Sequence, residues 1–221
     1  MTAPGPARPP GRVTLEGRYG RLEPIGPQHA RALWAATVPE RFLYLFGPPP
    51  ANEGEMAAWV HEAAAADDPL CFAVIDKATG RAEGRQALMR ITPAHGVIEV
   101  GSIYWGPAIA RTRVATEALY LHARHVFETL GYRRFEWKCD TRNEASKAAA
   151  QRFGFTFEGV FRQHMIIKGA NRDTAWFAML DSEWPRLRDG YERWLDPANF
   201  DGEGRQRSKL TFQRAAKPGG C

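Results

Sequence analysis

The stretch from Gly101 to Phe155 constrains the fold more than any other part of this 221-residue chain. A strand-like run over 98–105 leads into a Gly-Pro turn and a basic segment. An amphipathic helix over 114–130 and a second strand over 134–139 follow, and a second helix opens at Asn143. This order builds two parallel strands joined by a crossover helix. Such units bind ligands beyond the carboxyl ends of their strands, near helix N-termini.

The segments on either side of this unit predict antiparallel strands and further helices. Before it, we expect a short hairpin within 12–25, helices over 27–37 and 52–66, and a meander of strands over 70–75, 85–91 and 97–105. After it, strand-like runs over 154–168 and 173–180 enclose a turn, and a helix covers 183–195. The whole predicts an α+β fold with a mixed, mostly antiparallel central sheet flanked by helices and one βαβ unit.

The two ends of the chain differ in composition from its centre. Residues 1–11 are rich in proline and glycine, which predicts a disordered lead. Residues 12–195 have the length and apolar content of one ordinary domain. Residues 196–221 are rich in glycine, arginine and lysine, which predicts a basic, loosely attached tail.

Composition argues against several classes of protein. The mean hydropathy is −0.43, and no apolar run approaches the roughly 20 residues that a membrane-spanning helix needs. The N-terminus has no apolar segment of the kind found in secretory signals. Three cysteines, Cys71, Cys139 and Cys221, give no framework of disulfide pairs. A reducing, cytoplasmic setting is therefore expected.

The net charge of +5 leaves nucleic-acid binding open, but the basic residues are spread along the chain and interleaved with 25 acidic ones. A charged, solvated surface is therefore favoured over a nucleic-acid interface. No GxSxG and no Walker motif is present, which argues against hydrolase and P-loop chemistry. His122 and His125 stand three apart on one helix, but no third ligand accompanies them, so no metal is expected.

Two helix starts carry residues suited to a polar, phosphate-bearing ligand. The backbone N–H groups of 112–116 and the positive end of the helix dipole favour an anion such as pyrophosphate. The alternative is that Arg111 and Arg113 are solvated loop arginines and Thr112 only caps the helix. At the second helix, Asn143 is a favoured N-cap residue. Ser146 lies one turn on, and a solvent-facing serine is the alternative to a binding role.

Taken together in order, these residues resemble the GCN5-related N-acetyltransferases (GNAT), and within them the RimJ/RimL-like branch. The matching segments are Ala115-Thr116-Glu117-Ala118, His125-Val126-Phe127, Leu130-Gly131, Asp140 with Asn143 and Ser146, Phe153-Gly154-Phe155, Glu158 to Arg162, Gly169 to Thr174, and Glu183-Trp184-Pro185. The resemblance covers roughly residues 12–195. Asn-x-x-Ser followed by Gly-Phe and Glu-Gly is its most specific part.

The resemblance implies an acetyl-CoA-dependent N-acetyltransferase that moves an acetyl group directly to a primary amine of a small molecule, peptide or protein N-terminus. The cofactor-binding residues it implies are Ile103, Tyr104, Arg111, Thr112, Arg113, Val114, Ala115, Thr116, Asn143 and Ser146. Glu99 is the candidate base, and Ser146 the candidate donor of a proton to the departing thiolate. Segments 37–56 and 169–172 are expected at the acceptor, with Phe42 to Pro50 as an apolar wall. The partners implied are acetyl-CoA and an amine, and a homodimer is compatible with the sequence.

One departure from the family pattern keeps other functions open. Arg113 stands where the pyrophosphate loop of the family usually has a glycine, which lets backbone approach phosphate closely. The loss could weaken acetyl-CoA binding, or Arg111 and Arg113 could compensate by bonding to phosphate. The alternatives are a non-catalytic acyl-CoA-binding module and a nucleic-acid-binding protein that uses the basic tail from Arg205 to Lys217.

Overall fold

The structure is a computed structural model that describes residues 5–212. The strands are β1 Leu15–Glu16, β2 Gly20–Pro24, β3 Leu70–Asp76, β4 Arg81–Thr92, β5 Val97–Trp105, β6 Arg134–Asp140, β7 Thr156–Ile167 and β8 Ala170–Leu180. The α-helices are α1 Ala30–Ala35, α2 Glu53–Ala65, α3 Arg113–Arg124, α4 Glu144–Arg152 and α5 Trp184–Leu195. Short 3₁₀ turns at Pro27–His29, Pro39–Phe42, Pro93–His95 and Pro197–Asn199 join them.

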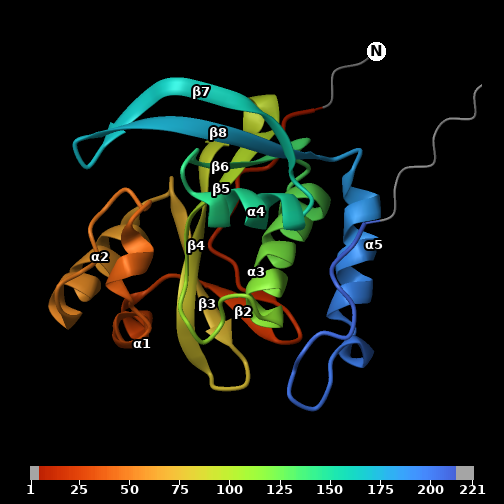
Figure 1. Cartoon of the computed structure of the whole chain (residues 1–221), viewed down its shortest axis with the longest axis horizontal. Coiled ribbons are helices and arrows are strands. Elements are labelled where there is room, and N and C mark those ends of the chain that lie inside the picture. The colour runs from red at the N-terminus through yellow and green to blue at the C-terminus, as the bar shows by residue number, and fades with distance from the viewer. Residues whose placement is uncertain (1–4, 213–221) are drawn as a thin grey trace, which may run out of the picture.

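All of these strands form one sheet in the order β1-β2-β3-β4-β5-β6-β8-β7. Every neighbouring pair is antiparallel except β5 and β6, which run parallel because α3 crosses between them (Figure 1). The α+β fold and the mixed, mostly antiparallel sheet predicted from the sequence are confirmed. The hairpin within 12–25 and the meander of β3, β4 and β5 are also present.

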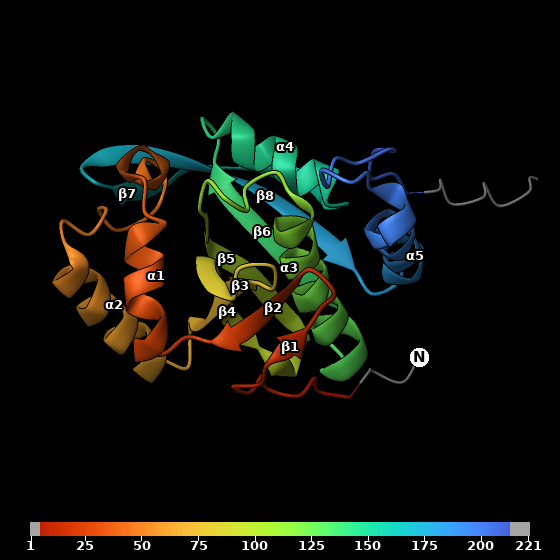
Figure 2. The same cartoon turned by 90° about the horizontal axis from the view of Figure 1, so that it is seen from below.

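Strand β3 shows how the sheet is buried on both faces. Leu70, Phe72 and Val74 belong to the larger core, with α3 and α5. The alternate residues, which include Cys71 and Ile75, belong to a second core with α1 and α2. Because successive side chains of a strand point to opposite faces, the continuous apolar run of β3 divides between the two cores. Figure 2 shows α1 and α2 on one side of the molecule and α3 with α5 on the other.

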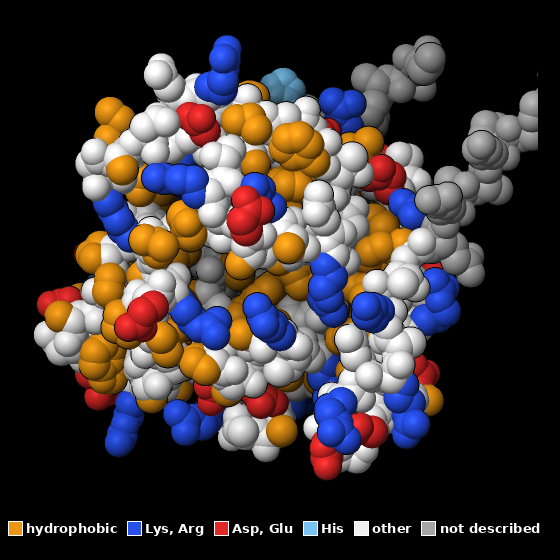
Figure 3. Space-filling view, viewed as in Figure 1, with side chains coloured by type: hydrophobic (Ala, Val, Ile, Leu, Met, Phe, Trp, Pro, Cys, Tyr) orange, Lys and Arg blue, Asp and Glu red, His pale blue; other side chains and the backbone are white. Residues whose placement is uncertain are grey.

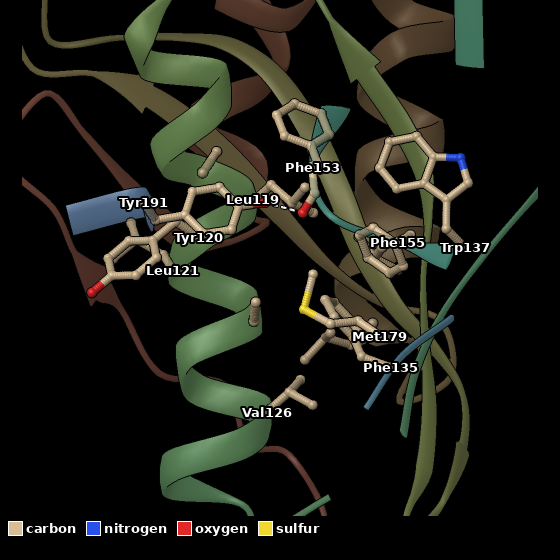
Figure 4. Packing of buried hydrophobic residues seen from close by; sticks show 14 of the residues in the cluster. Leu119, Tyr120, Leu121, Val126, Phe135, Trp137, Phe153, Phe155, Met179 and Tyr191 are labelled. Atoms are coloured by element: carbon tan, nitrogen blue, oxygen red, sulfur yellow. Dashed lines mark hydrogen bonds between the residues drawn. The ribbon is translucent and has the colours of Figure 1, made fainter. Parts of the chain in front are cut away.

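Helix α3 is the centre of the larger core. In Figure 4, Leu119 and Val126 from this helix lie toward Phe135 of β6, with Phe155 beside them. Leu119, Val126 and Phe135 are fully buried. The helix continues beyond Arg124 as a π-helical turn over His125–Thr129, so the predicted helix over 114–130 is confirmed. Its N-terminal end is thereby fixed beside the carboxyl ends of β5 and β6.

The carboxylate of Glu117 ties α3 to the β1–β2 turn. It accepts the backbone N–H groups of Arg18 at 2.8 Å, Tyr19 at 2.6 Å and Gly20 at 2.7 Å. A Cβ at Gly17 would lie only 2.6 Å from the Glu117 carboxylate, so glycine lets the turn approach this closely. Glu117 is therefore a residue that positions the first hairpin against the helix.

Some of the described residues in both predicted loose ends pack against the domain. Ala7 is buried, and its N–H donates to the carbonyl of Pro93. At the other end, Phe200 is buried and the Trp194 indole donates to Gln206 and to the Ser208 carbonyl. These contacts join residues far apart in sequence, so local composition gave no sign of them. The remainder of both segments, 1–4 and 213–221, lies outside the described residues.

Buried His122 predicts an acid-sensitive fold. Its ring is fully buried, and burial lowers its pKa to about 3 from an ordinary value of 6.5. The unfolded chain binds a proton below pH 6.5 and the folded chain does not until about pH 3. The stability is therefore complete above pH 6.5 and falls by up to about 1.4 kcal/mol per pH unit as the pH drops through this window.

Urea unfolding of parent and His122→Gln between pH 7.5 and 4.5 measures this effect. We expect the variant to lose less stability on acidification, since carboxylates contribute equally to both proteins. His95→Gln, at an exposed position, is the matched control and should follow the parent. Equal slopes in parent and His122→Gln would contradict the assignment.

Candidate active site

The two parallel strands separate at their carboxyl ends and leave a cleft between them. β5 and β6 are paired from Val97 with Arg134 to Val100 with Trp137, and the pairing ends there. Beyond this point a cleft of 1430 Å³ is lined by the last residues of both strands, by α3, α4 and α2, and by residues 40–50. On the face shown in Figure 3, lysine and arginine side chains gather around a hollow. The sequence predicted a ligand site at this edge.

Residues 40–50, which we call the strap, cross the cleft. Hydrogen bonds join the strap to β5, to the loop before α4 and to the β7–β8 hairpin. Arg41 Nη1 donates to the Trp105 carbonyl at 3.2 Å, and the Tyr44 hydroxyl donates to the Arg142 carbonyl at 3.1 Å. From the β7–β8 hairpin, Lys168 Nζ donates to the Phe42 carbonyl at 2.8 Å. The apolar run from Phe42 to Pro50 therefore lies against the cleft, where the sequence analysis expected a wall.

The α3 end of the cleft presents backbone donors and two cations. Within residues 5–212, the N–H groups of Arg111, Arg113 and Ala115 have no hydrogen-bond acceptor, and Thr112 caps the helix by accepting from Val114 N–H at 3.2 Å. Arg111 lines the cleft in a left-handed conformation, with φ of 64°. Arg152 of α4 also lines it, and its Nη1 donates to Thr116 Oγ1 at 3.2 Å. Free donors and cations suit a phosphate group.

The side chain of Arg113 lies away from this cleft. Its guanidinium carbon is 4.3 Å from the centre of the Tyr19 ring and 5.2 Å from that of Phe200. The sequence analysis considered a bond from this side chain to phosphate. In this position the guanidinium does not line the cleft and would not reach a phosphate bound there. Arg113 instead joins the first hairpin to the segment after α5.

The remaining predicted binding residues divide into two groups. Those that line the cleft are Ile103, Tyr104, Ala115, Thr116, Asn143 and Ser146. Val114 instead faces the core, and the ring of Tyr104 is mostly buried, with its hydroxyl donating to the Ala36 carbonyl at 2.7 Å. Thr112 acts as an N-cap.

Asn143 and Ser146 are held by local hydrogen bonds at the start of α4. Asn143 Oδ1 accepts the Ser146 N–H at 3.0 Å, so Asn143 is the predicted N-cap. Ser146 Oγ accepts the Trp137 indole N–H at 3.0 Å, which leaves the hydroxyl proton free to be donated elsewhere. Burial raises the pKa of the neighbouring Cys139 thiol, which argues against a cysteine nucleophile here.

Glu99 is a buried carboxylate that faces the cleft from β5. Its Oε2 lies 2.7 Å from Arg90 Nη1 and 2.8 Å from Lys138 Nζ. Lys138 also lies 2.7 Å from Glu136, the residue in register with Glu99 on β6. Of these two carboxylates, Glu99 lines the cleft and Glu136 does not. The sequence analysis named Glu99 as the candidate base, and the structure places this carboxylate inside a buried ion-pair network.

Several cations that line the cleft were not singled out from the sequence. Arg85 of β4 and Arg172 of β8 are buried, and burial lowers the pKa of both, that of Arg85 to about 10. Of these two, only Arg172 lies in a segment, 169–172, that was expected at the acceptor. Arg152 of α4 also lines the cleft. A buried arginine in a strand leaves no pattern that separates it from a solvated one. Arg152 could have been proposed from the sequence, because it ends the helix that begins after the predicted N-cap Asn143.

Comparison with known proteins decides the family. The family model of the GNAT acetyltransferase domain matches residues 21–156, more than half of the chain. The chain belongs to the GNAT acetyltransferases. The GNAT domain model covers most of β2, the α1–α2 pair, the meander, the central unit and the first residue of β7.

Solved GNAT structures share this fold over most of the chain. A GCN5-related N-acetyltransferase from Brucella melitensis is 56% identical, with a TM-score of 0.91, over 93% of this chain and 96% of that one. A probable GNAT acetyltransferase from Chromobacterium violaceum ATCC 12472 is 38% identical, with a TM-score of 0.78, over 84% and 94%. A RimL ribosomal L7/L12 α-N-protein acetyltransferase, 19% identical with a TM-score of 0.67 over 76% and 94%, shares the fold. No curated protein gives a significant match.

Three further observations bear on the expectations from composition. No helix within residues 5–212 is long and apolar enough to cross a membrane. In the same residues, no group of three or more His, Cys, Asp or Glu side chains is arranged to hold a metal ion. Arg205, at the start of the basic tail, forms ion pairs with Asp201 and Glu203.

Proposed function

We propose that this GNAT protein is an acetyl-CoA-dependent N-acetyltransferase that acts on a primary amine of a small molecule, peptide or protein N-terminus. The observation that carries the proposal is one cleft with free backbone donors and cations at one end and a carboxylate, Glu99, farther along β5. Acetyl-CoA would supply an acetyl group activated as a thioester. The residues of the chain would bind it, orient the amine and move protons.

At the α3 end, the N–H groups of Arg113 and Ala115 would receive the pyrophosphate, since they lack other acceptors. Arg111 and Arg152 would add charge-assisted bonds. Asn143 can cap α4 and present its amide N–H groups to the pantetheine arm, because only its Oδ1 is used in the cap. This arrangement supports binding by backbone and cations without the family's usual loop glycine.

The reaction needs a neutral amine that loses one proton as its nitrogen bonds to the acetyl carbon. We propose that Glu99 takes this proton, directly or through a water molecule. The carbon–sulfur bond breaks, and the sulfur leaves as a thiolate that needs a proton. Ser146 would donate one, since its hydroxyl proton is not used in the bond from Trp137. The serine would regain a proton from solvent water, to which Glu99 releases the proton taken from the amine. The products are an amide and a free thiol.

The two alternatives receive no particular support from the structure. The non-catalytic acyl-CoA-binding module was motivated by Arg113, whose side chain stacks on Tyr19 outside the cleft. The nucleic-acid alternative relied on a tail from Arg205 to Lys217, of which Arg205 is ion-paired and residues 213–217 lie outside the described residues. We therefore favour the enzyme, in a cytoplasmic setting in which the buried thiols Cys71 and Cys139 stay free.

Amine-dependent release of CoA thiol tests the proposal. The parent protein with acetyl-CoA is offered a panel of small amines, amino acids and peptides with free N-termini. We expect thiol release that needs both the amine and the protein, with one acetylated amine formed per thiol. Binding of acetyl-CoA without turnover of any amine in a broad panel would favour the binding module instead.

Arginine variants test which arginines near the start of α3 contribute to acetyl-CoA binding. We expect Arg111→Ala and Arg152→Ala each to weaken acetyl-CoA binding by about tenfold, the loss of one charge-assisted bond. Arg113→Ala is the matched control at the same loop. It should keep the parent's affinity and lose about 0.5–1 kcal/mol of stability with its aromatic contacts. Calorimetric titration and thermal unfolding measure these effects, and the reverse ranking of affinities would contradict the assignment.

A homodimer stays a prediction. Strand β7 is an edge strand with exposed apolar side chains, among them Phe161 at 52% and Ile166 at 78% exposure. Exposed apolar edge strands are common sites of pairing with a second copy. Sedimentation of the parent and of Ile166→Lys over a range of concentrations tests it.

A further inference from the structure

Arg85 lines the α2 side of the cleft as a buried cation without an acidic neighbour. Only 8% of the residue is exposed, and it faces the cleft. Its Nη1 donates to the carbonyl of Ser102 at 2.8 Å and to the Ser102 hydroxyl. Within residues 5–212, no carboxylate forms an ion pair with it, and its Nε and Nη2 have no acceptor. Several N–H groups of this guanidinium therefore remain for a ligand.

The local fold holds this guanidinium in place. Ser102 lies in the irregularity between β4 and β5, with φ of 50°, and Arg85 stands opposite Tyr104 in the register. The guanidinium carbon lies 4.1 Å from the centre of the Trp59 ring of α2. A guanidinium stacked on an indole has one face covered, so its remaining donors lie along its edge. The side chain is thus preorganised to receive a planar anion.

Three other charged residues that line the cleft have partners within the protein. Lys138 is paired with Glu99 and Glu136. Asp140 is paired with Arg142 at 2.7 Å. Glu55, exposed on α2, accepts the Ala51 N–H at 2.8 Å. Burying a charge without a counter-charge is costly, so an anion from outside that binds at Arg85 would restore the balance there.

We infer that Arg85 binds a carboxylate of the acceptor, so that the substrate is a small amine that also carries a carboxylate. This inference rests on the proposed function and names its substrate class. A carboxylate has the planar geometry and the single charge that one guanidinium matches. A small molecule is favoured because the guanidinium is buried beside Trp59 in a cleft crossed by the strap. Arg172, also buried at the cleft, has Thr174 as a partner and Phe46 5.1 Å away, and would lie near the same substrate.

Matched pairs of substrates test this without any mutation. A series of ω-amino acids is compared with the corresponding ω-amino amides, which keep the amine and the length and lose the charge. We expect kcat/KM to favour the acid by about 10- to 100-fold at the best length, mainly through KM. An ω-aminoalkylphosphonate of that length should be poorer than the acid. Equal rates for acid and amide, or a preference for the phosphonate, would overturn the inference.

Variants assign the preference to Arg85. In Arg85→Gln the ratio of acid to amide should fall to near one, while the affinity for acetyl-CoA stays at the parent's value. Arg85→Lys keeps the charge and should keep part of the preference. Arg41→Gln, at an exposed arginine of the strap that also lines the cleft, is the matched control and should keep all of it. Loss of the preference in Arg41→Gln but not in Arg85→Gln would move the subsite to the strap.

A binding experiment separates failure of this inference from failure of the proposed function. Calorimetric titration of the same acids and amides into the protein, with and without saturating CoA, needs no turnover. Tighter binding of the acid with no acetylation of any amine would keep the carboxylate subsite and reject the enzyme. Acetylation of amines with equal binding of acid and amide would keep the enzyme and reject the subsite.

Discussion

Glu99→Gln should reduce kcat for amine acetylation by about 10²- to 10⁴-fold, the usual contribution of a general base. Glutamine keeps the size of the side chain and an oxygen near Lys138, but it cannot take a proton from the amine. The affinity for acetyl-CoA should stay at the parent's value. Steady-state kinetics between pH 6 and 9, together with calorimetric titration, measure both quantities.

Glu136→Gln is the control for the ion-pair network around Glu99. Glu136 holds the same Lys138 at 2.7 Å, but it does not line the cleft. If Glu99 acts as the base, Glu136→Gln keeps a kcat close to that of the parent. Equal losses in the two variants would mean that Glu99 acts only by positioning Lys138. An unchanged kcat in Glu99→Gln would mean that a group other than Glu99 takes the proton from the amine.

Glu117→Ala should lower the stability of the fold by about 3 kcal/mol, because three backbone N–H groups lose their acceptor at once. For a domain of this size, that corresponds to a fall in Tm of about 6–12 °C. The donors are Arg18, Tyr19 and Gly20, so the first hairpin should lose its contact with α3. Thermal unfolding measures the loss of stability. Hydrogen exchange of residues 15–24 shows whether the loss is located in the first hairpin.

Glu192→Ala is the control on the same side of the molecule. Glu192 accepts one hydrogen bond, from the Tyr120 hydroxyl at 3.0 Å. Its loss should cost about 1 kcal/mol. A Glu117→Ala protein as stable as Glu192→Ala would show that water replaces the carboxylate at the turn. Protection of residues 15–24 unchanged from the parent would contradict its positioning role.

The elements of this fold could be predicted because their signals are local. Asn143 caps the helix that the sequence assigned to it, since an N-cap bond joins residues three positions apart. The strand expected over 70–75 is present as β3, and its apolar run is buried. The order of strands and helices around the crossover then determined the sheet.

The site was only partly predictable because its decisive contacts join distant residues. Arg113 was expected near phosphate from its place in the loop, but its aromatic partners come from Tyr19 and Phe200. Nothing near Arg85 in the sequence indicates that Ser102 and Trp59 hold it at the cleft. The packing of the segment after α5 depends in part on a distant contact of the same kind, because the ring of Phe200 lies 5.6 Å from that of Tyr19.

Thermal unfolding of the parent protein with and without saturating acetyl-CoA tests most directly whether the cleft between β5 and β6 binds this ligand. At about 100 times its dissociation constant, a ligand adds roughly 2.7 kcal/mol to the stability of the folded state. For a domain of this size, we predict that Tm rises by about 5–10 °C. An unchanged Tm at millimolar acetyl-CoA would contradict acetyl-CoA binding in this cleft, and with it the proposed acetyl transfer.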